Sequence, residues 1–128
     1  MNCAFKFSKK EFGSFAALIK SCGALNSSDF MSGDNDPLNR ADRIFYRKVL
    51  FDLMMKLTKR VEELKSDGNN LTLNDSECYV VFMAFSAYPV NAIKGLELSI
   101  LLQVREAIDK QYMNKETSIN NTINYELQ

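Results

Sequence analysis

The segment from Pro37 to about Lys65 constrains this 128-residue chain most, because a helix there would be apolar on more than one side. At about 100° per residue, its apolar residues form a broad stripe and a second strip about a quarter turn away. The stripe contains Tyr46, Leu50, Leu53, Met54, Leu57, Val61 and Leu64, and the strip contains Ile44, Phe51 and Met55. Full solvation is expected only for the side with Lys48, Asp52, Lys56, Lys59 and Glu63. An isolated surface helix has one apolar face, so we expect the rest of the chain, or another copy of it, to surround this helix.

A first helix is predicted ahead of this central segment. Ser8 and Glu11 have the spacing of a capping box, in which each side chain accepts a hydrogen bond from the other residue's backbone N–H. The helix should therefore begin at Lys9, and Gly23 stands where a helix commonly ends. Residues 26–36 are rich in Ser, Gly, Asn and Asp, which predicts a connection. The face expected to be buried carries Phe12, Phe15, Leu18, Ile19 and Cys22.

A third helix is predicted after the central one. Asn74 and Glu77 repeat the capping spacing, so this helix should begin near Asp75. Residues 78–88 are apolar nearly all round, which is typical of a helix buried in the middle of a protein. A buried strand is the alternative, because residues 79–82 favour extended structure. We favour the helix, since no turn residue interrupts the sequence that follows.

A last helix and a tail complete the prediction of an all-α fold. Pro89 cannot continue a helix, and Asn91 can cap the next one, which is predicted over residues 92–113. Residues 114–128 are rich in Asn, Thr and Ser, so we predict a flexible C-terminal tail. We therefore expect one compact four-helix domain over residues 1–113, with the central helix the longest.

The composition argues against several classes of function. The chain has no histidine, which removes Ser/His and Cys/His catalytic arrangements and the commonest metal ligand. Cys3, Cys22 and Cys78 are widely separated, so neither a disulfide framework nor a metal or redox site is predicted. A formal net charge of zero argues against a protein that mainly coats nucleic acid or an acidic membrane. We expect no catalysis, no metal and no cofactor.

The location is predicted from what the sequence lacks. No apolar run approaches the roughly 20 residues that a helix needs to cross a bilayer. The charged segment 1–10 lacks the apolar core of a signal peptide. Together with the unpaired cysteines, these features predict a cytoplasmic protein that does not bind membranes.

Three arginines near the start of the central helix form a candidate anion-binding site. Arg40, Arg43 and Arg47 lie within about 60° of one another, at a helix end whose dipole disfavours cations. Guanidinium groups suit a phosphate, a nucleic-acid backbone or an acidic partner. The alternative is ion pairing within the chain, for which Asp34, Asp36, Asp42 and Glu97 are the candidate carboxylates.

The N-terminal segment also interleaves charged and aromatic residues. Such segments can bind single-stranded nucleic acid by stacking bases on the rings. The cluster comprises Lys6, Lys9 and Lys10 with Phe5, Phe7 and Phe12. However, the capping pattern assigns Phe7 and Phe12 to the interior, which would remove them from such a surface.

The apolar residues outside the main stripe give the leading hypothesis of function. Ile44, Phe51 and Met55 lie on the central helix, and Leu98 and Leu102 fall on the polar side of the last helix. If the flanking helices leave these residues uncovered, they mark contacts with a protein partner or a second copy. We therefore predict a non-catalytic interaction or assembly protein, a homo-oligomer of accessory character. The alternative is a nucleic-acid-associated regulatory factor that uses the arginines and N-terminal lysines.

Overall fold

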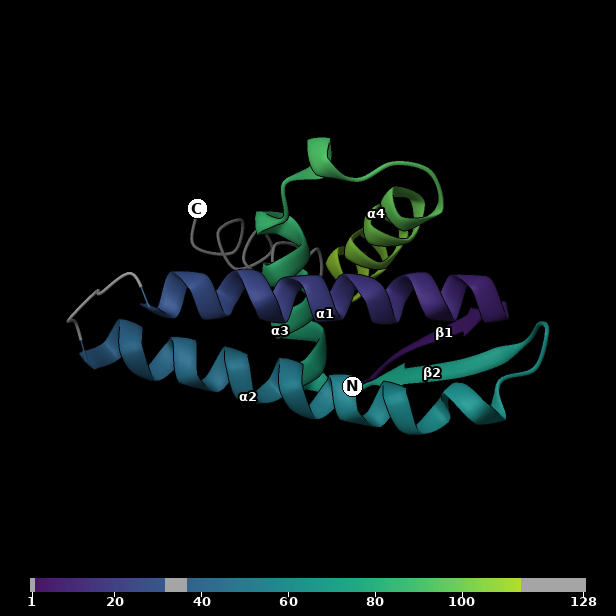
Figure 1. Cartoon of the computed structure of the whole chain (residues 1–128), viewed down its shortest axis with the longest axis horizontal. Coiled ribbons are helices and arrows are strands. Elements are labelled where there is room, and N and C mark those ends of the chain that lie inside the picture. Colours follow the sequence, from purple (N-terminus) through teal and green to yellow (C-terminus); the bar gives the residue numbers. More distant parts are fainter. Residues whose placement is uncertain (1, 32–36, 114–128) are drawn as a thin grey trace, which may run out of the picture.

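The computed structural model describes residues 2–31 and 37–113, with side-chain surroundings for residues 2–23 and 41–112. Within these ranges the chain is mostly helical, in the order β1, α1, α2, β2, α3, α4 (Figure 1). The predicted all-α class is therefore right for most of the described chain, but it misses a two-stranded sheet. The predicted C-terminal tail, residues 114–128, lies outside the described residues.

The sheet joins two segments that are far apart in the sequence. β1 (Cys3–Phe7) and β2 (Asn69–Leu73) pair antiparallel, with Cys3 opposite Leu73 and Phe7 opposite Asn69. Both strands alternate buried and exposed residues, which is the period of two that a half-buried strand requires. Neither strand is predicted above, because five residues give a short signal and each strand needs the other to satisfy its backbone.

α1 (Lys9–Met31) begins where the capping box predicts but continues well beyond its predicted end. The Ser8 backbone N–H donates to Glu11 Oε1 at 2.8 Å, and the Glu11 N–H donates to Ser8 Oγ at 3.1 Å. The five predicted core residues of its first half are all buried. Gly23 does not end the helix, because it is not among the glycines of positive φ that the left-handed cap requires. The predicted connection over residues 26–36 is therefore helical as far as Met31.

α2 (Pro37–Arg60) is the central helix, and it continues as a 3₁₀ turn at Val61–Glu63. It lies beside α1 and runs in the opposite direction (Figure 1). Its inward side buries Leu50, Leu53 and Leu57, as predicted. Val61, predicted to join that stripe, is 48% exposed, because the chain leaves the α-helical repeat at this residue.

α3 (Asp75–Ala87) settles the choice between helix and strand in favour of helix. Both hydrogen bonds of the predicted capping box are present between Asn74 and Glu77. The helix is less buried than predicted, because Tyr79 and Met83 are 49% and 42% exposed. Lys56 links α2 to this region, with its Nζ 3.6 Å from Glu77 Oε1 and 3.3 Å from the carbonyl oxygen of Thr72.

α4 (Leu96–Ile108) is shorter at both ends than the predicted helix over residues 92–113. A 3₁₀ turn at Val90–Ala92 precedes it, and a π-helical turn at Asp109–Met113 follows it. Gly95, with φ of 66° and ψ of −135°, prevents the helix from starting earlier, because this backbone conformation is not helical.

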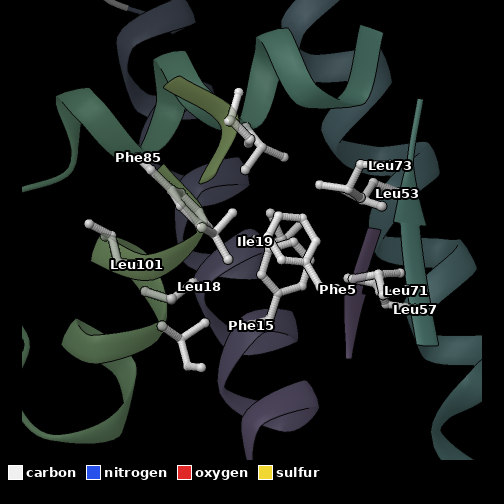
Figure 2. Packing of buried hydrophobic residues seen from close by; sticks show 14 of the residues in the cluster. Phe5, Phe15, Leu18, Ile19, Leu53, Leu57, Leu71, Leu73, Phe85 and Leu101 are labelled. Carbon is white, nitrogen blue, oxygen red and sulfur yellow. The ribbon is translucent and has the colours of Figure 1, made fainter. Parts of the chain in front are cut away.

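The hydrophobic core receives side chains from all six elements (Figure 2). Aromatic rings connect its parts: the ring centroids of Phe7 and Phe15 are 5.8 Å apart, and those of Phe15 and Phe85 are 5.9 Å apart. Phe5 stacks on Phe7 at 5.6 Å. These contacts tie β1 through α1 to α3, so the strand missed by sequence reasoning is an integral part of the core.

Candidate interaction surface

The outward side of α2 carries a row of exposed residues that we call the outer stripe. Its members are spaced alternately three and four residues apart, and all are exposed. They are Ala41, Ile44, Lys48, Phe51, Met55, Thr58 and Glu62. This spacing keeps side chains on one side of a helix and is the spacing of a seam between two packed helices.

The centre of the outer stripe is apolar and well exposed. Phe51 is 63% exposed, Ile44 52% and Met55 44%. The Thr58 hydroxyl donates to the carbonyl oxygen of Met54 at 2.8 Å, so its hydrogen is used within the helix. The stripe changes charge along its length, from Lys48 in the first half to Glu62 in the 3₁₀ turn that follows α2.

The outer stripe lies across the helix from the core rather than beside it. Leu50, Leu53 and Leu57 point inward, and at about 100° per residue Ile44, Phe51 and Met55 are about 150° away. Because α1 and α3 pack on the inward side, no described element covers the outer stripe.

The other predicted interface residues belong to a different part of the surface. Leu102 is 40% exposed and Leu98 is half-buried, and both lie on α4. α4 packs against α1 and α3, on the other side of α1 from α2 (Figure 1). The structure thus divides the five predicted interface residues into a set of three on α2 and a set of two on α4.

Sequence reasoning missed further exposed apolar residues outside the stripe, namely Phe45 on α2 and Tyr79 and Met83 on α3. Tyr79 and Met83 are one helical turn apart, and Phe45 is 47% exposed. The rings of Tyr46 and Tyr79 lie 6.1 Å apart, and burial together with this neighbour raises the pKa of Tyr46. The exposed positions were hidden in the sequence because residues 78–88 are apolar on nearly every side.

Two of the three predicted anion-binding arginines are not free cations. Arg43 is half-buried and Arg47 is exposed, and both already interact with neighbouring groups. The side chain of Arg40 lies outside the described residues. The placement of the first two is compatible with the predicted alternative, in which the arginines interact within the chain.

The N-terminal lysine cluster lacks exposed rings. Lys6, Lys9 and Lys10 are exposed, as a binding surface requires. Phe7 and Phe12 are fully buried, however, and Phe5 is only 8% exposed. The aromatic faces are therefore packed in the core, where no base can stack on them. One ring is also covered by a cation, since the Arg60 guanidinium lies 5.2 Å from the centroid of Phe12.

A small polar junction holds the two ends of the described chain together. The Cys3 thiol donates to Gln111 Oε1 at 3.2 Å, and burial, with Cys78 alongside, raises the pKa of Cys3 to about 12. The Tyr112 hydroxyl donates to Asp75 Oδ1 at 2.9 Å, which lowers the pKa of that carboxyl. A thiol with such a pKa is protonated at neutral pH and is a poor nucleophile, so this junction reads as structural.

Comparison of the chain with protein families, with curated proteins and with solved structures gave no match. Across residues 2–31 and 37–113, no helix combines the length and the apolar character needed to span a bilayer. In the same part of the chain, no three His, Cys, Asp or Glu side chains gather as a metal site would require. The outer stripe of α2 therefore remains the best-defined candidate site.

Proposed function

We propose that this chain is a non-catalytic assembly protein that associates with itself through the outer stripe of α2. One observation carries the proposal. Ile44, Phe51 and Met55 project together from the outward side of a helix whose inward side is already filled by the core. Contiguous apolar patches on soluble proteins mark interaction sites more often than isolated exposed residues do.

The expected contribution of Phe51 follows from its exposure. Burying an aromatic side chain of this size stabilises an interface by about 1.5–3 kcal/mol. In a two-fold symmetric dimer each copy contributes the same patch, so Phe51 is buried twice and its contribution to the free energy of association doubles. Because 63% of the side chain remains to be buried, a charge at this position should weaken association by about two orders of magnitude, at about 1.4 kcal/mol per factor of ten.

The proposal is tested by light scattering after size exclusion across a range of protein concentrations. We expect the wild type to form a multimer and Phe51→Asp to be a folded monomer. Leu102→Asp is the control, because it also replaces an exposed large apolar side chain by a charge, but on α4. A wild type that stays monomeric, or a Phe51→Asp variant of unchanged mass, would contradict the proposal.

The competing proposal is a nucleic-acid-associated factor that uses Arg40, Arg43, Arg47 and the N-terminal lysines. The buried rings of the lysine cluster and the engaged arginines give it less support. It predicts that the protein copurifies with material absorbing at 260 nm and sheds it in salt. Under this proposal, Arg43→Glu with Arg47→Glu abolishes retention on heparin; unaltered retention would exclude it.

We further propose that the protein works in the cytoplasm, without a cofactor. The three cysteines, Cys3, Cys22 and Cys78, are buried and unbridged, which agrees with a reducing compartment. Titration of the purified, non-reduced protein with a thiol reagent in denaturant tests this. Three free thiols per chain are expected, and fewer would indicate an oxidising environment.

A further inference from the structure

We infer that the occupant of the outer stripe is the outer stripe of a second copy, packed antiparallel about a two-fold axis between Phe51 and Met55. This inference rests on the proposed self-association and adds its geometry. α2 runs along one edge of the molecule (Figure 1), and its exposed stripe extends for about 30 Å at 1.5 Å per residue. A second helix of equal length can therefore lie along it.

Two of the three apolar residues of the stripe, Phe51 and Met55, match one another in this arrangement. The seam alternates steps of three and four residues along the helix. In an antiparallel pair, a residue that ends a three-residue step faces a residue of the other copy that ends a four-residue step. With the axis at residue 53, Phe51 of each copy faces Met55 of the other, Lys48 faces Thr58, and Ile44 faces Glu62 at the two ends. The largest exposed apolar side chains of the stripe thus meet at the centre, where water is best excluded.

The two charges within the stripe, Lys48 and Glu62, favour the antiparallel direction, whereas Asp52 beside it favours the parallel one. Lys48 of one copy then lies about one helical turn, or about 6 Å, from Glu62 of the other, within reach of a lysine side chain. The two-fold axis produces this pair twice. A parallel pair would instead place Lys48 against Lys48 and Glu62 against Glu62, which is repulsive. Antiparallel helix dipoles also oppose each other favourably.

A charge-swap cycle tests the direction of packing, with the dissociation constant measured by analytical ultracentrifugation. Lys48→Glu and Glu62→Lys should each weaken the dimer about tenfold, because two favourable pairs become two unfavourable ones. The double variant should return to within about threefold of the wild type. In a parallel dimer each single change only replaces one like-charged pair by another, so unchanged affinity in the single variants would overturn the inference.

Replacing Asp52 should change the affinity of the dimer in opposite directions in the antiparallel and parallel geometries. In the antiparallel dimer it lies near the axis, beside Asp52 of the other copy, so Asp52→Asn should tighten association. In the parallel dimer it lies beside Arg47 of the other copy, and the same change should weaken association. The aspartate is exposed and replaced by an isostere, so the variant should fold normally.

Cross-linking distinguishes a wrong geometry from a wrong function. A short bifunctional maleimide should join K48C of one copy to T58C of the other. It should not join K48C to K48C, since residue 48 of one copy lies about 15 Å along the axis from residue 48 of the other. The native cysteines are buried and serve as the unreactive background. Homotypic K48C links in a stable dimer would overturn the antiparallel arrangement alone, whereas a monomeric wild type would overturn the proposed function with it.

Discussion

Replacing the buried Asn69 by alanine should destabilise the fold far more than the same change at its neighbour Asn70. Asn69 is 5% exposed and stands at the start of β2. Its Nδ2 donates to the carbonyl oxygens of Phe7, at 3.1 Å, and Lys65, at 2.8 Å. Its Oδ1 accepts from the Lys65 backbone N–H at 2.8 Å. The Asn69 side chain therefore connects the turn after α2 to the end of β1 by hydrogen bonds.

The magnitude follows from these three bonds. A net hydrogen bond contributes about 0.5–1.5 kcal/mol, and a buried group left without a partner costs about 1–3 kcal/mol. The Lys65 groups are only partly buried, so water can replace their lost bonds in part. The bond to the Phe7 carbonyl is buried. We therefore expect Asn69→Ala to lower the free energy of unfolding by about 2–4 kcal/mol.

Urea unfolding followed by circular dichroism measures this difference. With a slope of about 1–3 kcal/mol per molar urea, the midpoint of Asn69→Ala should fall by about 1–2 M. Asn70→Ala is the control, because Asn70 is exposed on the same strand, and its change should stay within about 0.5 kcal/mol. Equal midpoints for the two variants would refute the assignment of the buried side-chain bonds to Asn69.

Two further predictions concern the backbone at glycines and the pH dependence of stability. Gly95→Ala should destabilise the protein by about 1–3 kcal/mol because φ is 66° there. Gly13→Ala, in the second turn of α1 with open space around the added methyl group, should stabilise it by about 0.5–1 kcal/mol. Thermal melts of the two variants that move in the same direction would contradict this. Burial raises the pKa of Cys22 from 9.0 to about 12, so the native thiol keeps its proton where the unfolded one loses it. The free energy of unfolding should therefore fall as pH rises from about 9 toward 12. Between pH 8 and pH 10.5, the melting temperature of Cys22→Ala should fall less than that of the wild type.

Local sequence signals were sufficient for the starts of α1 and α3, but not for that of α4, which begins at Leu96 instead of residue 92. Ser8 with Glu11 and Asn74 with Glu77 form both hydrogen bonds of the predicted capping boxes. These signals are reliable because a capping box depends on residues three apart, whatever the rest of the chain does. The end of α1 could not be predicted in the same way, since the cost of Gly23 inside a helix is only about 1 kcal/mol and packing against α2 can offset it.

The sequence predicted the α2 part of the candidate surface but not how that part is placed relative to the other exposed apolar residues. The spacing of Ile44, Phe51 and Met55 placed them together on one side of the central helix, and the structure leaves all three exposed. Their separation from Leu98 and Leu102 was not predictable, because it depends on which face of α1 each helix occupies. Likewise, nothing within residues 78–88 distinguishes Tyr79 and Met83 from their buried neighbours.

By itself, the sequence determined where α1, α2 and α3 begin, which residues share a helix side, and that the central helix has two apolar sides. These properties follow from the 3.6-residue repeat and from hydrogen bonds between near neighbours. The tertiary structure decided that β1 pairs with β2, and that the Leu50, Leu53 and Leu57 side of α2 enters the core while the Phe51 side stays outside. Both outcomes depend on contacts between segments tens of residues apart, whose free energy is gained only when the whole core assembles.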